Sequence, residues 1–256
     1  MSRITVKDRR VWVTGASAGI GRAVVVELAR RGANVIASAR HEQALHDLAR
    51  ECGGGRVLPL PLDVTDHQGN LHAAEVIRQR MGGLDIAFLN AGICEYVDVA
   101  TFDSAVFERT MKTNFLSMVY GIEAMLPLLR EGRQPQLIGM SSTVAYRGLP
   151  RAEAYGASKA AIKHLFESLQ IDLQRDGIAV SVVCPGFVRT PLTDRNDFPM
   201  PFLVEVDEAA RRIVDGIEAR RPEIHFPKRF SIPFKLLALL PHRLYGALCS
   251  RMVRST

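Results

Sequence analysis

Short apolar runs, rich in β-branched residues, alternate along this chain with longer segments in which apolar residues recur at helical spacing. Strands that are buried on both faces appear as continuous apolar runs, and their alternation with helices implies parallel strands joined by crossovers. The pattern therefore predicts a doubly wound, Rossmann-like parallel α/β sheet with helices on both faces. The runs expected as strands are Val11–Thr14, Val35–Ala39, Val57–Leu62, Ile86–Leu89, Leu137–Met140, Ala179–Val183 and Ile224–Phe226. The segments expected as helices are Ile20–Arg31, Gln43–Arg50, Leu71–Met81, Ser104–Leu129, Ala154–Arg175 and Asp207–Arg220.

The chain divides into two parts by composition. Residues 1–227 contain no segment that reads as a linker, and we expect them to form one dinucleotide-binding catalytic domain. Residues 228–256 hold six basic residues and no acidic one, and apolar residues alternate with the bases. Pro233 and Pro241 are expected to break this amphipathic extension into short helices. Such helices either lie on an anionic membrane surface or pack on a neighbouring subunit or over the active site.

Charge and cysteine content exclude several classes of protein. The six bases of the C-terminal extension account for the formal net charge of +6, so a nucleic-acid-binding face on the domain is not expected. The four cysteines are far apart and form no CxxC pair, so neither a metal site nor a disulfide framework is expected. Charged residues occupy the place where a signal peptide needs an apolar core, and no apolar run is long enough to span a bilayer. We expect a cytoplasmic protein, peripheral at the inner membrane face if the extension binds lipid.

A glycine-rich turn follows the first predicted strand, where residues 14–21 read TGASAGIG and an apolar-periodic helix begins. Gly15 allows a sharp turn off the strand, while Gly19 and Gly21 let backbone approach a pyrophosphate and let the helix pack closely on the sheet. The helix N-terminus presents free N–H groups and a positive dipole end to phosphates. An ordinary strand–helix turn is the alternative reading of the glycines alone.

Tyr155 and Lys159 open a helical segment and, being four residues apart, share one helix face. A phenol has an ordinary pKa of about 10, and a neighbouring cation is expected to lower it. A phenol tuned in this way protonates the oxygen of a carbonyl as hydride arrives, or deprotonates an alcohol in the reverse direction. The alternative is a cation that merely lies beside an aromatic ring on a helix surface.

Two further polar residues fit the same chemistry. Ser142 ends the fifth predicted strand, at the edge where parallel sheets place ligands, and its hydroxyl would stabilise a developing oxyanion. Ser141 is the neighbouring candidate. Asn114 lies inside a predicted helix, where an amide is disfavoured and so needs a reason. A polar position at a subunit contact is the other reading of Asn114.

Together these motifs resemble the short-chain dehydrogenase/reductase family, and the resemblance covers roughly residues 8 to 227. It rests on Thr-Gly-x-x-x-Gly-x-Gly, on Asn-Ala-Gly after the fourth strand, on the serine and Tyr-x-x-x-Lys, and on a Pro-Gly loop after the sixth strand. The resemblance implies an oxidoreductase that interconverts a ketone or aldehyde and an alcohol, with Asn114, Ser142, Tyr155 and Lys159 as catalytic residues. It implies that Asn114 holds a water on a proton path from Lys159 to solvent, and that Asp63 contacts the adenine. The cofactor-binding residues it implies are Gly15, Ser17, Gly19, Ile20, Gly21, Arg40, Asp63, Asn90, Ala91, Gly92, Tyr155, Lys159, Pro185, Gly186, Val188 and Thr190.

The end of the second predicted strand indicates which nicotinamide cofactor is used. An NAD site usually places a carboxylate there to accept from the ribose hydroxyls. This chain has Ser38, Ala39 and Arg40, so no carboxylate repels a 2′-phosphate and a planar guanidinium is present to bind one. The sequence therefore favours NADP(H) over NAD(H). A solvated arginine, and a turn role for Asp63, are the alternatives.

The substrate is less well defined. Residues 191–203 are expected to form a lid, and Tyr146, Phe187, Phe198, Met200 and Phe202 are candidates to line a pocket for a hydrophobic or lipid-like substrate. The alternative is that the apolar residues of the lid pack on their own domain. A non-catalytic NADP(H)-binding sensor on the same fold is the competing function, which an intact catalytic set disfavours. The family resemblance further implies a homodimer or homotetramer.

Overall fold

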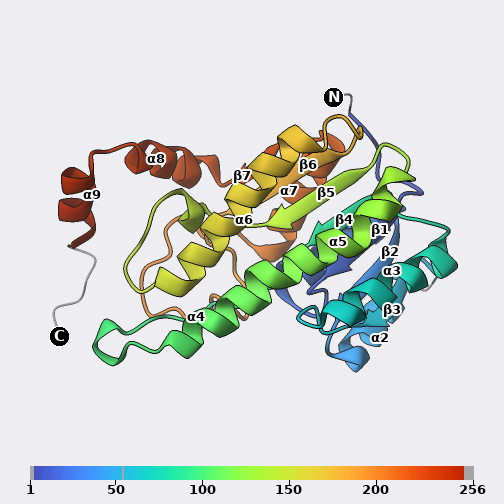
Figure 1. Ribbon diagram of the computed structural model, residues 1–256, viewed down its shortest axis with the longest axis horizontal. Helices are drawn as coiled ribbons and strands as arrows, with labels where there is room; N and C mark the ends of the chain where they lie inside the picture. The colour runs from blue at the N-terminus through green and yellow to red at the C-terminus, as the bar shows by residue number, and fades with distance from the viewer. Residues whose placement is uncertain (1–2, 54, 251–256) are drawn as a thin grey trace.

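The computed structural model describes residues 3–53 and 55–250, and its centre is one parallel sheet of seven strands. The strand order is β3-β2-β1-β4-β5-β6-β7, and every adjacent pair is parallel (Figure 1). The predicted doubly wound fold is thereby confirmed, because the order reverses between β1 and β4 and opens a ligand position at the strand ends. The strands are β1 (Arg10–Thr14), β2 (Asn34–Ala39), β3 (Val57–Pro61), β4 (Ile86–Leu89), β5 (Gln136–Met140), β6 (Ala179–Pro185) and β7 (Glu223–Phe226).

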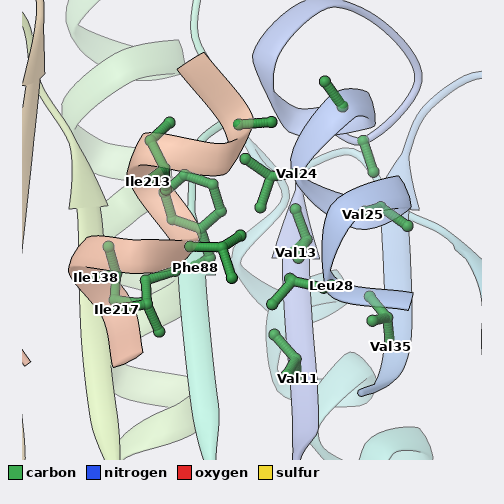
Figure 2. Packing of buried hydrophobic residues seen from close by; sticks show 14 of the residues in the cluster. Val11, Val13, Val24, Val25, Leu28, Val35, Phe88, Ile138, Ile213 and Ile217 are labelled. Atoms are coloured by element: carbon green, nitrogen blue, oxygen red, sulfur yellow. The ribbon is translucent and has the colours of Figure 1, made fainter. Parts of the chain in front are cut away.

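Helices cover both faces of this sheet, as the alternating pattern predicts. One face is covered by α1 (Gly19–Arg30), α2 (Glu42–Glu51) and α7 (Val206–Glu218). The other is covered by α3 (His67–Met81), α5 (Ser117–Arg130) and α6 (Glu153–Asp172). Figure 2 shows the first layer, where side chains of α1 and α7 meet those of the central strands.

Alternation of side chains along each strand fills two separate cores. Val11 and Val13 of β1 point into the core under α1, whereas Trp12 between them points into the core under α5. The indole N–H of Trp12 donates a 2.9 Å hydrogen bond to the Ser38 hydroxyl, which satisfies both buried groups. Burial on both sides explains why the strands appear as continuous apolar runs in the sequence.

The long helix predicted over residues 104–129 is interrupted by one wider turn. It consists of α4 (Ser104–Met111), a π-helical segment over Lys112–Leu116, and then α5. Asn114 lies at the centre of the π-helical turn and is fully buried. Single π turns inside α-helices are frequent at functional sites, because the extra residue redirects a side chain.

The C-terminal extension forms two helices, α8 (Lys228–Ala238) and α9 (His242–Cys249), at one end of the long axis of the molecule (Figure 1). Pro241 separates them as predicted, but the predicted break at Pro233 is wrong, since Pro233 lies inside α8. The missing amide N–H of Pro233 removes one helical hydrogen bond. The rings of Phe230 and Phe234, which precede and follow it in the helix, stack with their centres 5.8 Å apart. The last six residues of the extension, 251–256, lie outside the described residues.

No helix among residues 3–53 and 55–250 combines the length and the apolar character that are needed to cross a bilayer.

Candidate active site

The glycine turn is shaped by contacts that leave no room for side chains. Gly15 has a left-handed φ of 67°, and a Cβ on it would lie 2.8 Å from the Cα of Ala91. A Cβ on Gly21 would lie 2.3 Å from the Gly15 carbonyl oxygen and 2.4 Å from Asn90 Nδ2. Ala18 precedes α1 without a capping side-chain hydrogen bond, and the first turn of α1 holds no acid. The positive end of this helix is thus open to an anion.

Asn90 joins the ends of β1 and β4. Its backbone N–H donates to the Thr14 hydroxyl at 2.9 Å, and its side-chain amide donates to the Thr14 carbonyl at 3.0 Å. The next glycine, Gly92, makes room for the catalytic candidates, because a Cβ there would lie 3.1 Å from Asn114 Oδ1 and 3.3 Å from Lys159 Nζ. The Asn-Ala-Gly motif therefore holds the sheet edge together and keeps space beside the lysine.

Asn114 fixes the loop that leaves β4. Its side chain accepts from the Ile93 N–H at 2.7 Å and donates to the Ile93 carbonyl at 2.9 Å. The same amide donates at 2.9 Å to the Ser158 hydroxyl, which in turn donates to the Tyr155 carbonyl at 2.7 Å. These partners all lie within the chain, so Asn114 is a polar anchor between the π-helical turn and α6 and not a surface position waiting for another subunit.

Tyr155, Lys159 and Ser142 come together at the carboxyl end of β5. Lys159 is almost fully buried, its Nζ donates to the Met140 carbonyl at 2.9 Å, and that nitrogen lies 5.6 Å from the centre of the Tyr155 ring. The Ser142 side chain lies close enough to the Tyr155 phenol to lower its pKa. Ser141 is excluded as the catalytic hydroxyl by its position, because it is buried and donates to the Lys159 carbonyl at 2.8 Å.

The pKa values of this pair differ from the sequence-based expectation. Burial raises the pKa of Tyr155 well above its ordinary value, and the hydrogen bond with Ser142 offsets only part of that rise. Burial also lowers the pKa of Lys159 to about 8, with the nearby Cys94 and Cys184 acting in the opposite direction. The expected acidification of the phenol is not found, because both groups have lost water and each resists charge. Tyr155 is therefore a neutral phenol at neutral pH.

Two residues close to Tyr155 and Lys159 were not predicted from the sequence. Cys94 and Tyr96 lie two and four residues after Gly92 of Asn-Ala-Gly, and both contribute to raising the pKa of Tyr155. Burial raises the pKa of the Cys94 thiol to about 11, although the Lys159 ammonium opposes the shift. Their position after the central strand β4 could have indicated them, because the carboxyl ends of parallel strands carry ligand-binding residues.

The lid, residues 191–203, is held down by several contacts. The Tyr96 hydroxyl donates to the Asn196 side chain, and Arg151 pairs with Asp197 at 2.8 Å. Phe198 meets the Tyr96 ring edge-on at 5.9 Å between ring centres. The lid is thereby fastened to the loop after β4 and to the segment that precedes α6.

A continuous row of aromatic rings runs from the lid to the segment after the catalytic serine. Neighbouring ring centres are 5.5–6.3 Å apart, with Phe187 as the link between the lid and α8. The row is Tyr96, Phe198, Phe187, Phe230, Phe234 and Tyr146. The other two predicted pocket residues lie apart from it: Met200 Sδ accepts from Asn196 at 3.2 Å, and Phe202 is half exposed under the guanidinium of Arg229.

Tyr146 is less a free pocket wall than a structural link. Its hydroxyl donates to the Glu223 carboxylate at 2.6 Å, and Lys235 of α8 pairs with the same carboxylate. Arg147 donates to the carbonyls of Ala238 and Leu240 at 2.5 and 3.1 Å. Because Tyr146 ends the short helical turn Thr143–Tyr146 that follows Ser142, the C-terminal helices are attached directly to the catalytic strand end.

Arg147 also reaches α9. Its guanidinium carbon lies 4.5 Å from the centre of the Tyr245 ring, and the Tyr245 hydroxyl donates to the Gly148 carbonyl at 2.8 Å. One side of α8 and one side of α9 therefore pack against the segment that follows Ser142, which is one of the arrangements expected for the extension.

The loop after β6 closes the site above the glycine turn. Thr190 lies close to the turn, because a Cβ on Gly19 would meet its methyl group at 3.4 Å. Pro185 ends β6, and Gly186 admits the ring of Phe230, which a Cβ would approach to 2.8 Å. Val188 is buried and pairs with Val204 across the base of the lid. The Pro-Gly loop thus lies between the glycine turn on one side and α8 on the other.

The remaining cofactor candidates occupy the edge around β2 and the turn. Arg40 is exposed just after β2. The pKa of Asp63 is lowered mainly by hydrogen bonds from Thr65, and the charge of Arg40 adds to this effect. Asp63 accepts a hydrogen bond from the Thr65 N–H at 2.9 Å, so one of its carboxylate oxygens stabilises the turn that follows β3. Ser17 is partly buried in the glycine turn, and Ile20 packs against the core under α1.

Comparison with known proteins agrees with this geometry. Residues 9–198 match the model of the short chain dehydrogenase family. An uncharacterized oxidoreductase of Myxococcus xanthus is 36% identical over 247 residues, covering 95% of this chain and 97% of that protein. The 11-beta-hydroxysteroid dehydrogenase A of Sesamum indicum is 33% identical over 192 residues, 73% of this chain and 55% of that protein. A crystal structure of a short chain dehydrogenase/reductase from Burkholderia phymatum in complex with NAD has a TM-score of 0.84 at 20% identity, covering 91% of this chain and 94% of that one.

Proposed function

Since this chain belongs to the short-chain dehydrogenase/reductase family, whose members are oxidoreductases acting on CH–OH groups, we propose that it is an NADP(H)-dependent reductase of hydrophobic ketones or aldehydes. The observation that carries this proposal is the grouping of the Tyr155 hydroxyl, the Ser142 side chain and the Lys159 ammonium at one strand end. That strand end adjoins the point where the sheet order reverses.

The chain offers a fitting place for the nucleotide. The glycine turn supplies close backbone and an uncapped helix end for the diphosphate, and Thr190 lies next to Gly19 on the side of the loop after β6. Gly92 keeps open the space beside Lys159 and Asn114. A bound nicotinamide supplies or accepts the hydride of the reaction.

The protein's own part is to hold and move one proton. Burial keeps the Tyr155 phenol protonated at neutral pH, so it donates to the substrate oxygen as negative charge develops there. The Ser142 hydroxyl, which lies beside Tyr155, stabilises the same oxygen. Lys159, whose pKa is about 8, is positioned to return a proton to the phenolate, and Asn114 fixes the loop beside it.

Preference for NADP(H) rests on the surroundings of Arg40. The buried Ser38 hydroxyl is already used by Trp12, and Ala39 has no polar group, so no carboxylate opposes a 2′-phosphate at this strand end. Arg40 is exposed and free to orient toward one. We expect Arg40→Ser to lower kcat/KM for NADPH by about ten- to a hundredfold, the range for a charge-assisted hydrogen bond, and to leave the value for NADH almost unchanged. Arg211→Ser, an exposed arginine of α7, is the matched control.

A large apolar substrate is proposed because the site is bordered by rings. Phe187 and Phe198 link the lid to the loop after β6, and the row that they form continues into α8. The name of the Sesamum indicum relative points in the same direction, since a steroid is a rigid apolar alcohol or ketone. Apolar walls with few polar groups are typical of sites for such ligands.

The test is NADPH oxidation across ketones of rising size and apolarity, followed by Tyr155→Phe on the best substrate. We expect kcat to fall by about 10²–10⁴-fold while NADPH binding, read from nucleotide fluorescence, persists. Tyr120→Phe, on α5 beside His67, is the control and should behave as wild type. Equal rates for Tyr155→Phe and wild type would refute the proton transfer. NADPH binding without turnover of any ketone or alcohol would favour the competing sensor function.

A further inference from the structure

The outer side of α8 carries a second apolar face, which points away from the protein. Leu239 is 80% exposed, Leu236 is 63% exposed and Ile232 is 45% exposed. They follow one another at intervals of four and three residues, so they form a single stripe. The inner side of the same helix is occupied by Phe230 and Phe234, which belong to the aromatic row. Internal packing therefore accounts for one side of α8 and not for the other.

The next helix along the chain also carries exposed leucines. Leu244 and Leu248 of α9 are 60% and 44% exposed and lie one turn apart, while Tyr245 on the inner side is buried under Arg147. Figure 1 shows α9 following α8 at the same end of the molecule. Isolated exposed leucines are ordinary, but five exposed apolar residues on two consecutive helices mark an interaction surface. We call Ile232, Leu236, Leu239, Leu244 and Leu248 the outer face.

The charged residues of α8 and α9 themselves have one sign. Lys228 begins α8 and Arg243 lies in α9, and both are exposed. Neither takes part in an ion pair within residues 3–53 and 55–250. Residues 224–256 contain no aspartate or glutamate at all. A partner surface that complements this face is therefore apolar inside and negatively charged at its border.

From this combination we infer that the outer face of α8 and α9 docks onto the surface of an anionic phospholipid bilayer. Helices of this kind lie in the plane of the headgroups, with leucines in the acyl boundary and bases at the phosphates. A symmetric contact between two copies fits less well, because it would bring the bases of one copy against those of the other. The surface is independent of the proposed chemistry.

Docking would also bring the lid to the bilayer. Arg229 of α8 lies over the ring of Phe202 at 4.8 Å, and Phe202 and Leu192 at the two ends of the lid are both partly exposed. A hydrophobic ketone dissolved in the bilayer would then meet the site at its lid, a consequence that rests on the proposed function.

The experiment is flotation of the full chain with vesicles of phosphatidylcholine, with and without phosphatidylglycerol, at low and at high salt. We expect wild type to float with the anionic vesicles only, and less at high salt. Leu236→Glu/Leu239→Glu should weaken this binding at least tenfold. Val99→Glu/Ile171→Glu changes two equally exposed apolar residues elsewhere by the same charge and should float as wild type does.

Three results would overturn the inference. Wild type that stays at the bottom of the gradient with anionic vesicles would show that the face does not bind lipid. Equal loss in both double variants would show a general effect of charge. A smaller sedimentation coefficient for Leu236→Glu/Leu239→Glu in the absence of vesicles would assign the face to a contact between copies. The experiment measures binding to vesicles and not enzymatic activity. Inactivity toward every ketone would therefore refute the proposed function without affecting this test.

Discussion

Lys159 Nζ lies 5.6 Å from the centre of the Tyr155 ring and donates its 2.9 Å hydrogen bond to the Met140 carbonyl. The spacing of one helical turn places the two side chains together. The backbone carbonyl of Met140 in β5, and not the phenol, accepts the hydrogen bond from the Lys159 ammonium. Burial then sets the charge state of both groups. The pair is consequently built to keep a phenol protonated, with a cation close by that gives up its proton readily.

The depressed pKa of Lys159 makes stability depend on pH in a defined window. Between about pH 8, the pKa of Lys159 in the folded protein, and its ordinary 10.5, the unfolded chain binds more protons, so the free energy of unfolding rises with pH. Relative to Lys159→Met, wild type should gain roughly 3 kcal/mol across this window and nothing below pH 7. Urea unfolding of both proteins from pH 7 to 10.5 measures the difference. A flat difference would mean that the folded protein does not lower the pKa of Lys159.

Gly21→Ala should damage the nucleotide site because its Cβ meets backbone. The 2.3 Å approach to the Gly15 carbonyl oxygen forces α1 away from the turn. We expect a loss of about 1–3 kcal/mol in the free energy of unfolding and no measurable NADPH binding. Gly246→Ala in α9, which has open space around it, should leave binding unchanged and stabilise the protein by under about 1 kcal/mol. Calorimetry and nucleotide fluorescence give both quantities, and tight binding by Gly21→Ala would contradict the account of the turn.

Asn114→Ala tests the anchor between the π-helical turn and the catalytic helix. It leaves the half-buried N–H and carbonyl of Ile93 without their partners, so a destabilisation of about 1–3 kcal/mol is expected. Asn70→Ala removes a similarly buried amide, bonded to the carbonyls of Val64 and Asp66, from a position outside the catalytic group. Both variants should lower Tm, but only Asn114→Ala should also lower kcat, by more than tenfold. Equal kcat values would reduce Asn114 to a purely structural residue.

Arg147→Leu should loosen the C-terminal helices. The guanidinium donates to the carbonyls of Ala238, which ends α8, and of Leu240 after it, and it stacks on Tyr245. These contacts together are worth about 1–3 kcal/mol. The exposed pair of Arg78 with Glu131 serves as a comparison, since Arg78→Leu should change stability by less than about 1 kcal/mol. Chemical unfolding provides the free energies. If the two substitutions cost the same, α8 and α9 are not held by the segment after Ser142.

The sequence predicted features that depend on local spacing. Continuous apolar runs between helical segments predicted the parallel sheet. A strand that is buried on both faces is apolar at successive positions, and this pattern is visible within a few neighbouring residues. The interval between Tyr155 and Lys159 placed them on one face, and the position of Ser142 after a strand placed it beside them. The glycines of the turn were recognised for the same reason, since each acts on the backbone of its own segment.

Only the tertiary structure decided what the rest of the chain does around this centre. The pKa of Tyr155 is set by burial and by groups as distant in sequence as Cys94 and Cys184, and desolvation of this kind has no signature in any single segment. The same holds for the attachment of α8 and α9 to Tyr146 and Arg147, which joins residues about 90 positions apart through side chains that look like ordinary surface residues in the sequence. Local periodicity thus determined the sheet and the catalytic helix, whereas the environment of the phenol and the place of the basic extension depend on which distant segments fold against one another.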